Sequence, residues 1–290
     1  MTVTILSLHS YPVKSCAGID HRSVALTSAG LHKDRHWVLV DRHGVFMTQR
    51  QHARMALIQP SLDDRGLTLR APGMSPFPVA NDSREPEPAR VALHIFRSRT
   101  LGADEGDEVS GWLSEFLQLP CRLLRVHPQA DRVASLTHVE AWRDKAHTWA
   151  PDFPARHRFG FADGFPLLVA NQASLDELNG QLASQGMPAV GMNRFRPNIV
   201  LQGLPAYDED YLAGWHTQGL RFAFVKPCAR CPIPNIDPAT AVSGTEPGLT
   251  LARHRQRPEG VLFGVNAVVA GAENGAVLTA GQEVTVEYDL

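Results

Sequence analysis

KPCARC, residues 226–231, places Cys228 and Cys231 three positions apart among cationic side chains. The neighbouring Lys226 and Arg230 favour the thiolate form of a cysteine. Such a pair occurs in three kinds of site: half of a zinc centre, a dithiol redox centre, or one thiolate ligand on a thiophilic transition metal. A fourth interpretation is two buried and inert cysteines, because free cysteines are often simply buried.

The residues around this segment argue against two of these interpretations. A zinc site needs two more ligands, and the remaining cysteines, Cys16 and Cys121, are isolated in the sequence. A dithiol motif usually begins a helix, which Pro234 would interrupt. The metal-thiolate and the buried-cysteine interpretations both remain open at this point.

The overall composition restricts the class of protein and its partners. The chain has 290 residues, 43% of them hydrophobic and 20% charged, with a formal net charge of −2. These values argue against a disordered chain and against general affinity for nucleic acid or membranes. Any anion site must therefore be built locally from a few cations. With four cysteines, no apolar run of about 20 residues and no cationic leader, a cytoplasmic location is expected.

Short apolar segments predict a chain that is mainly β. One helix is predicted near 109–117, where apolar residues recur at helical spacing before Pro120. Another is predicted from Ser174, where Glu177 completes a capping box. The stretch 129–158 has no clear period and is the candidate interdomain connection. Predicted strands cover 3–8, 23–27, 37–41, 45–48, 55–58, 67–70, 91–96, 121–126, 166–170, 198–202, 220–225, 261–270 and 284–288.

Several motifs in order along the chain resemble one family. The cysteine segment and the residues after it are similar to the signature of the MOSC family, which binds molybdenum cofactor. Segments of the first half resemble the β-barrel domain that precedes MOSC in the amidoxime-reducing enzymes, and a later segment resembles their central arginine motif. The matching segments are YPVKSC (11–16), DRHW (34–37), TQRQ (48–51), RFRPNIV (194–200), KPCARC (226–231) and NIDPAT (235–240).

This resemblance implies a fold. We expect a mainly β (α+β) protein with two β-barrel-like domains and a few flanking helices. Residues 1–125 would form the MOSC N-terminal β-barrel domain, and residues 130–290 would form the MOSC domain. The cofactor would lie in the cleft between them, because the matching ligands come from both halves.

The resemblance also implies a set of site residues. Cys231 would be the molybdenum thiolate, with Cys228 as a neighbour, and Cys231 and Asp163 are the catalytic candidates. Guanidinium and ammonium groups suit the cofactor's phosphate and its electron-rich dithiolene. The expected cofactor-binding residues are Lys14, Ser15, Arg35, Arg194, Arg196, Asn198 and Cys231.

Three departures from the family pattern affect these expectations. Gly164 and Phe165 stand where relatives often carry a hydroxyl side chain that can bond the cofactor. Ala229 replaces a common serine between the cysteines, and Ala241 replaces a glycine, so that turn is expected to differ. No four-cysteine ferredoxin domain follows, so electrons are expected from a separate protein.

The implied activity is reduction of N-hydroxylated compounds such as amidoximes, hydroxylamines and N-hydroxylated bases. The cofactor would be molybdenum–molybdopterin, and the electron donor an external ferredoxin-type or flavin reductase. The alternative is a non-catalytic protein that carries molybdenum cofactor or relays sulfur through a Cys231 persulfide. A zinc-binding interaction module, holding zinc through both cysteines, is a third interpretation.

Overall fold

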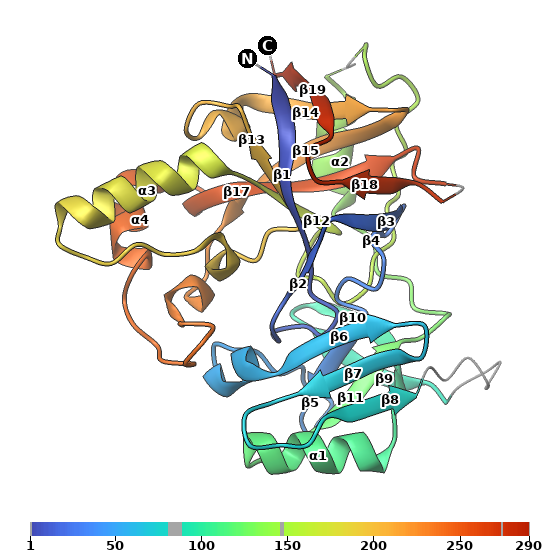
Figure 1. Ribbon diagram of the computed structural model, residues 1–290. Helices are drawn as coiled ribbons and strands as arrows, with labels where there is room; N and C mark the ends of the chain where they lie inside the picture. The colour runs from blue at the N-terminus through green and yellow to red at the C-terminus, as the bar shows by residue number, and fades with distance from the viewer. Residues whose placement is uncertain (1, 81–88, 146–147, 274, 290) are drawn as a thin grey trace.

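Seven strands close into a β-barrel in the computed structural model, which describes residues 2–80, 89–145, 148–273 and 275–289 (Figure 1). The strands follow one another in the order β12, β13, β1, β19, β14, β15 and β17, and pairing of β17 with β12 completes the ring. Their inward side chains form one apolar core. The strands are β1 (Val3–Ser10), β12 (Leu167–Asn171), β13 (Ile199–Gln202), β14 (Leu212–Thr217), β15 (Leu220–Ala229), β17 (Gly260–Ala270) and β19 (Glu283–Tyr288).

The first strand of the chain belongs to this barrel. β1 pairs with β13 on one side and with β19 on the other. The early strand β2 (Ile19–His21) pairs with β1. Strand β3 (Ser23–Thr27) pairs with the late strand β18 (Val277–Thr279) on one side and with β4 (Gly30–Leu31) on the other. Strand pairing therefore crosses the expected boundary between 1–125 and 130–290, and that boundary itself stays a prediction.

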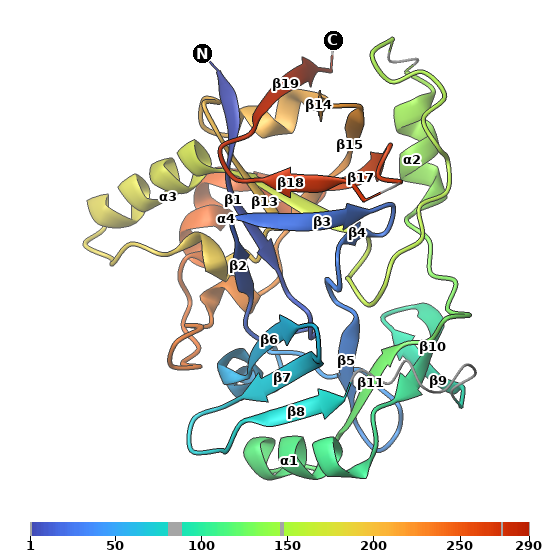
Figure 2. The same ribbon diagram turned by 45° about the vertical axis from the view of Figure 1, so that its right-hand side comes forward.

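A second lobe lies beside the barrel and is built as a half-barrel (Figure 2). One of its sheets has the order β5, β11, β10, β9, and the other has the order β6, β7, β8. Helix α1 (Asp107–Leu117) covers this lobe, and its predicted stripe of apolar residues is buried. The strands are β5 (Trp37–Val40), β6 (Gln59–Asp63), β7 (Gly66–Arg70), β8 (Phe77–Ala80), β9 (Val91–Ile95), β10 (Ser98–Asp104) and β11 (Arg122–Val126).

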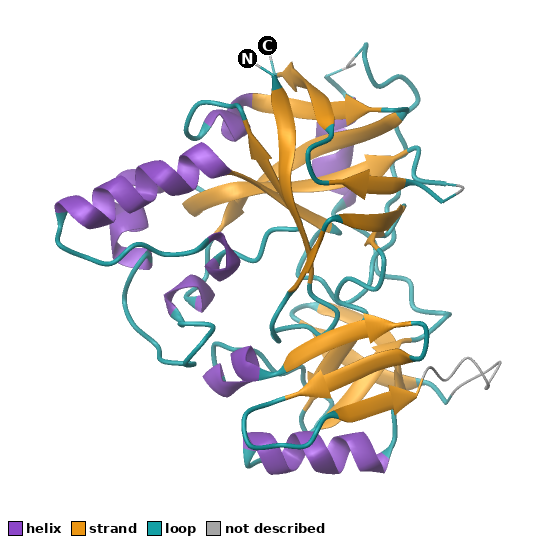
Figure 3. Cartoon of the chain, in the orientation of Figure 1, coloured by secondary structure: helices purple, strands orange, loops and turns teal. Residues whose placement is uncertain are grey.

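The other three α-helices flank the barrel (Figure 3). The expected mainly β fold with few helices is confirmed, with 38% strand and 20% helix. No helix in the described ranges is both long enough and apolar enough to cross a membrane. The other elements are α2 (Leu136–Arg143), α3 (Gln172–Ser184), α4 (Gly248–Arg255), β16 (Gln256–Arg257) and the 3-10 helices η1 (Ala53–Leu57), η2 (Met192–Arg194), η3 (Asp208–Tyr211) and η4 (Ile233–Asn235).

Three local predictions are wrong. The segment 55–58 lies mostly in the 3-10 helix η1, because a short apolar run does not distinguish strand from helix. In 45–48 only Val45 and Phe46 pair, each in an isolated bridge. Helix α3 begins at Gln172, capped by Asn171, whose side chain accepts a hydrogen bond from the amide of Ala173. Ser174 is no cap, since its hydroxyl donates to the buried Glu209.

Candidate functional site

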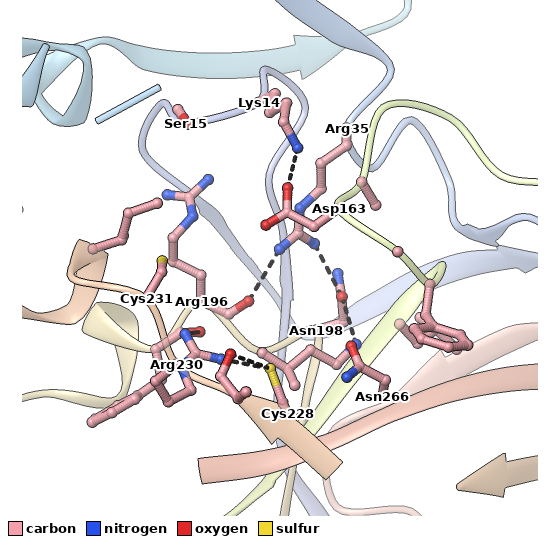
Figure 4. A pocket seen from close by; sticks show the side chains of 18 of the residues that line it. Lys14, Ser15, Arg35, Asp163, Arg196, Asn198, Cys228, Arg230, Cys231 and Asn266 are labelled. Atoms are coloured by element: carbon pink, nitrogen blue, oxygen red, sulfur yellow. Dashed lines mark hydrogen bonds and ion pairs between the residues drawn. The ribbon is translucent and has the colours of Figure 1, made fainter. Parts of the chain in front are cut away.

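A cavity of about 300 Å³ lies where the barrel meets the half-barrel lobe. Its walls come from segments far apart in the sequence, so only the complete fold creates it. Figure 4 shows Lys14, Arg35 and Asp163 on one side of it, and the two cysteines with Arg196 and Arg230 on the other. It is lined by Lys14, Ser15, Arg35, Arg50, Phe96, Ala162, Asp163, Gly164, Phe165, Leu167, Leu168, Phe195, Arg196, Asn198, Cys228, Ala229, Arg230, Cys231, Ile233 and Asn266.

The lining is strongly positive although the chain is not. Five cationic side chains and one carboxylate line the cavity, a formal charge of +4, whereas the whole chain carries −2. Concentrating cations in a concave site raises the local positive potential and attracts anions. The cavity is therefore suited to an anionic ligand. The five cations are Lys14, Arg35, Arg50, Arg196 and Arg230.

Lys14 and Asp163 form the ion pair of the cavity. The Lys14 ammonium is buried, donates to the Phe161 carbonyl at 2.8 Å and pairs with the Asp163 carboxylate. Burial lowers the pKa of Lys14, and the Asp163 charge opposes that shift. Partial desolvation alone would raise the pKa of Asp163, but Lys14, Arg35 and Arg50 together lower it to about 2. Asp163 is therefore ionised at neutral pH.

Arg35 is fixed by four contacts. Its guanidinium donates to Asp34 at 2.6 Å, to the side-chain oxygen of Asn198 at 3.0 Å and to the Arg196 carbonyl at 3.1 Å. It also lies over the Tyr11 ring at 4.4 Å. Asn198 is buried, and its amide also bridges the Leu168 amide and the His9 carbonyl. Asn198 therefore orients Arg35 while lining the cavity.

Arg196 has no carboxylate partner in the described ranges. Its guanidinium donates to the Cys16 carbonyl at 2.5 Å and lies 4.2 Å from the centre of the Tyr11 ring. Burial, together with the charge of the nearby Arg35, lowers the pKa of Arg196 to about 10. Burial also raises the pKa of Tyr11 to about 12. A half-buried cation without an anion is suited to bind an anionic ligand, because such a ligand would supply the missing negative charge.

Three lining residues have left-handed backbone conformations that side chains rarely adopt. Ser15 has φ 65°, Arg35 has φ 45° and Arg196 has φ 57°. Each non-glycine residue in this region costs about 1 kcal/mol or more, and such strain concentrates at functional sites. Surrounding hydrogen bonds stabilise these backbone conformations. For example, the side-chain amide of Gln49 donates to the Ser15 carbonyl at 2.8 Å.

The cysteines stand where β15 ends at the cavity. Two register shifts against β17 interrupt the strand, one between Phe224 and Lys226 and one between Pro227 and Ala229. Bulges of this kind accommodate a proline within a sheet and re-aim neighbouring side chains. Both Cys228 and Cys231 are half-buried and line the cavity.

Arg230 contacts Cys228. Its guanidinium donates to the Cys228 sulfur at 3.1 Å and to the Phe195 carbonyl at 2.8 Å, while its Nε is buried without a hydrogen-bond partner. Among the described residues no side chain donates a hydrogen bond to the Cys231 sulfur, which leaves this sulfur available to a ligand in the cavity. The assignment of the metal ligand to Cys231 stays a prediction.

The structure separates the two arginines of the RFRPNIV motif. Arg194 does not line the cavity, since its guanidinium donates to the Pro234 carbonyl at 3.2 Å and to Asp237 at 3.0 Å. It braces the turn after the cysteines, where Ala241 takes the left-handed φ of 59° that the expected glycine would favour. The turn thus keeps a glycine-like conformation with alanine. All other predicted site residues line the cavity.

Sequence reasoning missed several residues of the cavity. Arg50 and Arg230 belong to segments already singled out, so their charge was the available signal. Phe96 and Asn266 carry no motif, and only strand pairing brings them to the site. The described residues contain no group of three or more His, Cys, Asp or Glu side chains that could hold a metal.

Two known domain families match the chain, one after the other. Residues 2–120 match the MOSC N-terminal beta barrel domain, and residues 156–285 match the MOSC domain. Mitochondrial amidoxime-reducing component 1 of Homo sapiens is 31% identical over 262 residues, which cover 87% of this chain and 72% of that protein. The Mus musculus protein of the same name is 30% identical, covering 87% of this chain and 71% of that protein.

A third relative is much longer. Molybdenum cofactor sulfurase of Bos taurus is 30% identical over 271 residues, which cover 90% of this chain but 30% of the sulfurase. The chain therefore spans less than a third of that relative. Because both domain matches stand in order and cover most of its length, this chain belongs to the MOSC family, with an N-terminal MOSC beta barrel domain followed by a MOSC domain.

Proposed function

We propose that the protein binds molybdenum cofactor in this cavity and reduces N-hydroxylated compounds, with electrons from a separate ferredoxin-type or flavin reductase. The observation that carries the proposal is the cavity charge of +4, with a free cysteine at its wall, in a chain of charge −2. The family relation to amidoxime-reducing components supports it.

The residues present fit the cofactor. A pterin phosphate and a dithiolene are anionic or electron-rich groups that need several fixed cations. Arg196 and Arg230 donate only to carbonyl and sulfur acceptors and have no carboxylate partner among the described residues. They would hold the anionic groups, Lys14, Ser15, Arg35 and Asn198 would line the pterin, and Cys231 would supply the thiolate.

The overall reaction consumes two electrons and two protons. An N–OH group is converted to N–H and the oxygen leaves as water, so the N–O bond breaks. When bound, the cofactor supplies the two-electron chemistry, and the protein supplies binding, orientation and electrostatics. Because Asp163 has a pKa of about 2, it is a carboxylate at neutral pH and cannot donate a proton. Its role would be to keep the neighbouring Lys14 charged and oriented.

The first experiment is elemental analysis with pterin fluorescence, on protein from a host that makes molybdenum cofactor. We expect near-stoichiometric molybdenum and pterin, both reduced in Arg196→Ala. The loaded protein should then oxidise reduced viologen when benzamidoxime is added. No molybdenum from a competent host would sink the proposal, and stoichiometric zinc bound through both cysteines would favour the interaction module.

A second candidate function is a carrier of molybdenum cofactor or a sulfur relay through Cys231. It is favoured by the similarity to molybdenum cofactor sulfurase over 90% of this chain. A carrier should show no substrate-dependent viologen oxidation and should lose its cofactor to an apo-acceptor. A reductase should do the opposite in both assays. The cytoplasmic location stays a prediction from the sequence.

A further inference from the structure

Arg132 lies behind the cavity and is almost completely buried, with 6% of its surface exposed. Its guanidinium donates to three backbone carbonyls, those of Gly160 and Ala162 at 2.7 Å and that of Asp163 at 2.9 Å. The same group lies 4.5 Å from the centre of the Phe159 ring. A planar guanidinium presents donors in a fixed fork, so it fixes several acceptors at once.

All four backbone carbonyls of the segment 160–163 accept hydrogen bonds from cationic side chains. Arg132 takes the carbonyls of residues 160, 162 and 163, and Lys14 takes the carbonyl of Phe161 at 2.8 Å. The Phe161 amide donates to the Arg35 carbonyl at 2.8 Å. Gly160 lies so close to Arg35 that a Cβ would be 2.9 Å from that carbonyl. The segment is therefore clamped between Arg132 on one side and Lys14 and Arg35 on the other.

We propose that Arg132 is a positioning residue of the cavity, which clamps segment 160–163 and thereby holds the Asp163 carboxylate against Lys14. It does not line the cavity, so it acts through Asp163 and is not itself catalytic. The inference deepens the proposed function, on which its role in cofactor binding rests. The clamp itself is a property of the protein without cofactor.

The chain offers a matched control in Arg255. This arginine is also buried, with 5% exposed, lies 4.0 Å from the Tyr207 ring and has a buried Nε without a partner. The Nε of Arg132 is likewise buried and has no hydrogen-bond partner among the described residues. Arg255 pairs with Asp210 and does not line the cavity. Lysine at either position keeps the charge but loses the planar fork.

The test is a carboxyl 13C-NMR titration of the apo protein from about pH 7 to about pH 3, where an unperturbed aspartate near 3.9 would take up a proton. The Asp163 signal is identified by its absence in Asp163→Asn. We expect Asp163 to stay ionised in the wild type and in Arg255→Lys, and to titrate in Arg132→Lys with its pKa raised by roughly one unit or more. Loss of the clamp without loss of charge would be the cause.

Two results would overturn the proposal. One is a folded Arg132→Lys in which Asp163 stays ionised throughout, and the other is a wild-type Asp163 that already titrates above about pH 3. Should Arg132→Lys not fold, Arg132→Gln, which keeps amide donors, is judged by the same criteria. In loaded protein, Arg132→Lys should release molybdenum about tenfold faster, and Arg255→Lys should not. Protein that binds no molybdenum would sink the proposed function while leaving the titration decisive.

Discussion

The cations on the two sides of the cavity differ in whether they have a carboxylate partner. On the Lys14 wall, formed by Lys14, Arg35 and Asp163, each cation has a carboxylate partner: Lys14 pairs with Asp163, and Arg35 pairs with Asp34. The cysteine wall is formed by Arg196, Cys228, Arg230 and Cys231. Among the described residues, its two arginines contact only carbonyls, one sulfur and aromatic rings.

This difference separates two tasks. Paired cations are already neutralised, so they fix geometry more than they attract a ligand. Unpaired and partly buried cations remain poorly compensated until an anion arrives, and a charge-assisted bond to an anion is about twice as strong as a neutral one. We infer that the cysteine wall supplies most of the anion affinity and that the Lys14 wall sets orientation.

The largest expected effect comes from the cysteines. Cys231→Ala should lose turnover roughly 100-fold or more in the viologen assay, because the proposed metal ligand is gone. Cys228→Ala should lose less than roughly tenfold, because it removes only the contact with Arg230. Metal content is measured beside the rate. The reverse ranking of the two variants would transfer the ligand role to Cys228.

The next effect concerns the two neighbouring arginines of one motif. Arg196→Met should lower molybdenum and pterin content about tenfold, since hydrogen bonds to charged groups contribute roughly 1.5–3 kcal/mol. Arg194→Met serves as the matched control, because Arg194 faces Asp237 and not the cavity. An equal loss of molybdenum and pterin in both variants would contradict the distinction between the walls. An arginine that lines the cavity and one that does not would then contribute equally to cofactor binding.

A smaller effect concerns the acid stability of the Lys14 wall. Asp163 has a pKa of about 2 in the fold, against about 3.9 in an unfolded chain. A lowered carboxyl pKa contributes stability that is complete above about pH 4 and is lost as the pH falls toward 2. Wild type should therefore be more stable than Asp163→Asn at neutral pH, by a margin that narrows across this window in urea denaturation.

The margin should stay small, because 65% of the Asp163 side chain is exposed and solvent screens the pair. A difference between the two proteins that does not change between about pH 5 and about pH 2 would show that the carboxylate charge contributes nothing to stability. In that case the Lys14 wall would not be a charge-paired wall in the sense used here.

The smallest effect is expected at the exposed rim. Arg50 is exposed and lies over the Phe96 ring at 5.2 Å. Arg50→Met should weaken cofactor retention by no more than about threefold at low salt, because exposed charges contribute little. The difference should vanish near 1 M salt, where the Debye length is about 3 Å. A loss as large as that of Arg196→Met would place Arg50 within the anion site.

The sequence predicted which residues belong to the site better than it predicted how they are arranged. Lys14, Arg35 and Arg196 were identified through motifs, and all three line the cavity. Arg194 has the same chemistry and lies two residues from Arg196, but the left-handed φ of Arg196 separates their directions. The amino-acid sequence does not reveal this backbone conformation, so Arg194 and Arg196 could not be distinguished from the sequence.

The fold shows the same division between local and long-range information. The stripe of α1 was visible because its residues are near in sequence and share one face. The place of β1 between β13 and β19 could not be read locally, because β1 alternates like any half-buried strand. The position of Phe96 at the cavity depends on such long-range pairing and was missed for that reason.

The placement of β1 has a consequence for synthesis. Val3 pairs with Val284, so the ring cannot close until β19 has left the ribosome. Pairings this far apart in sequence are slow, because the entropy of loop closure opposes them before the contacts form. The cavity walls are assembled by the same closure. A nascent chain whose β19 has not yet emerged would therefore contain the cysteine segment and the cavity arginines, but without the closed ring that assembles them around the cavity.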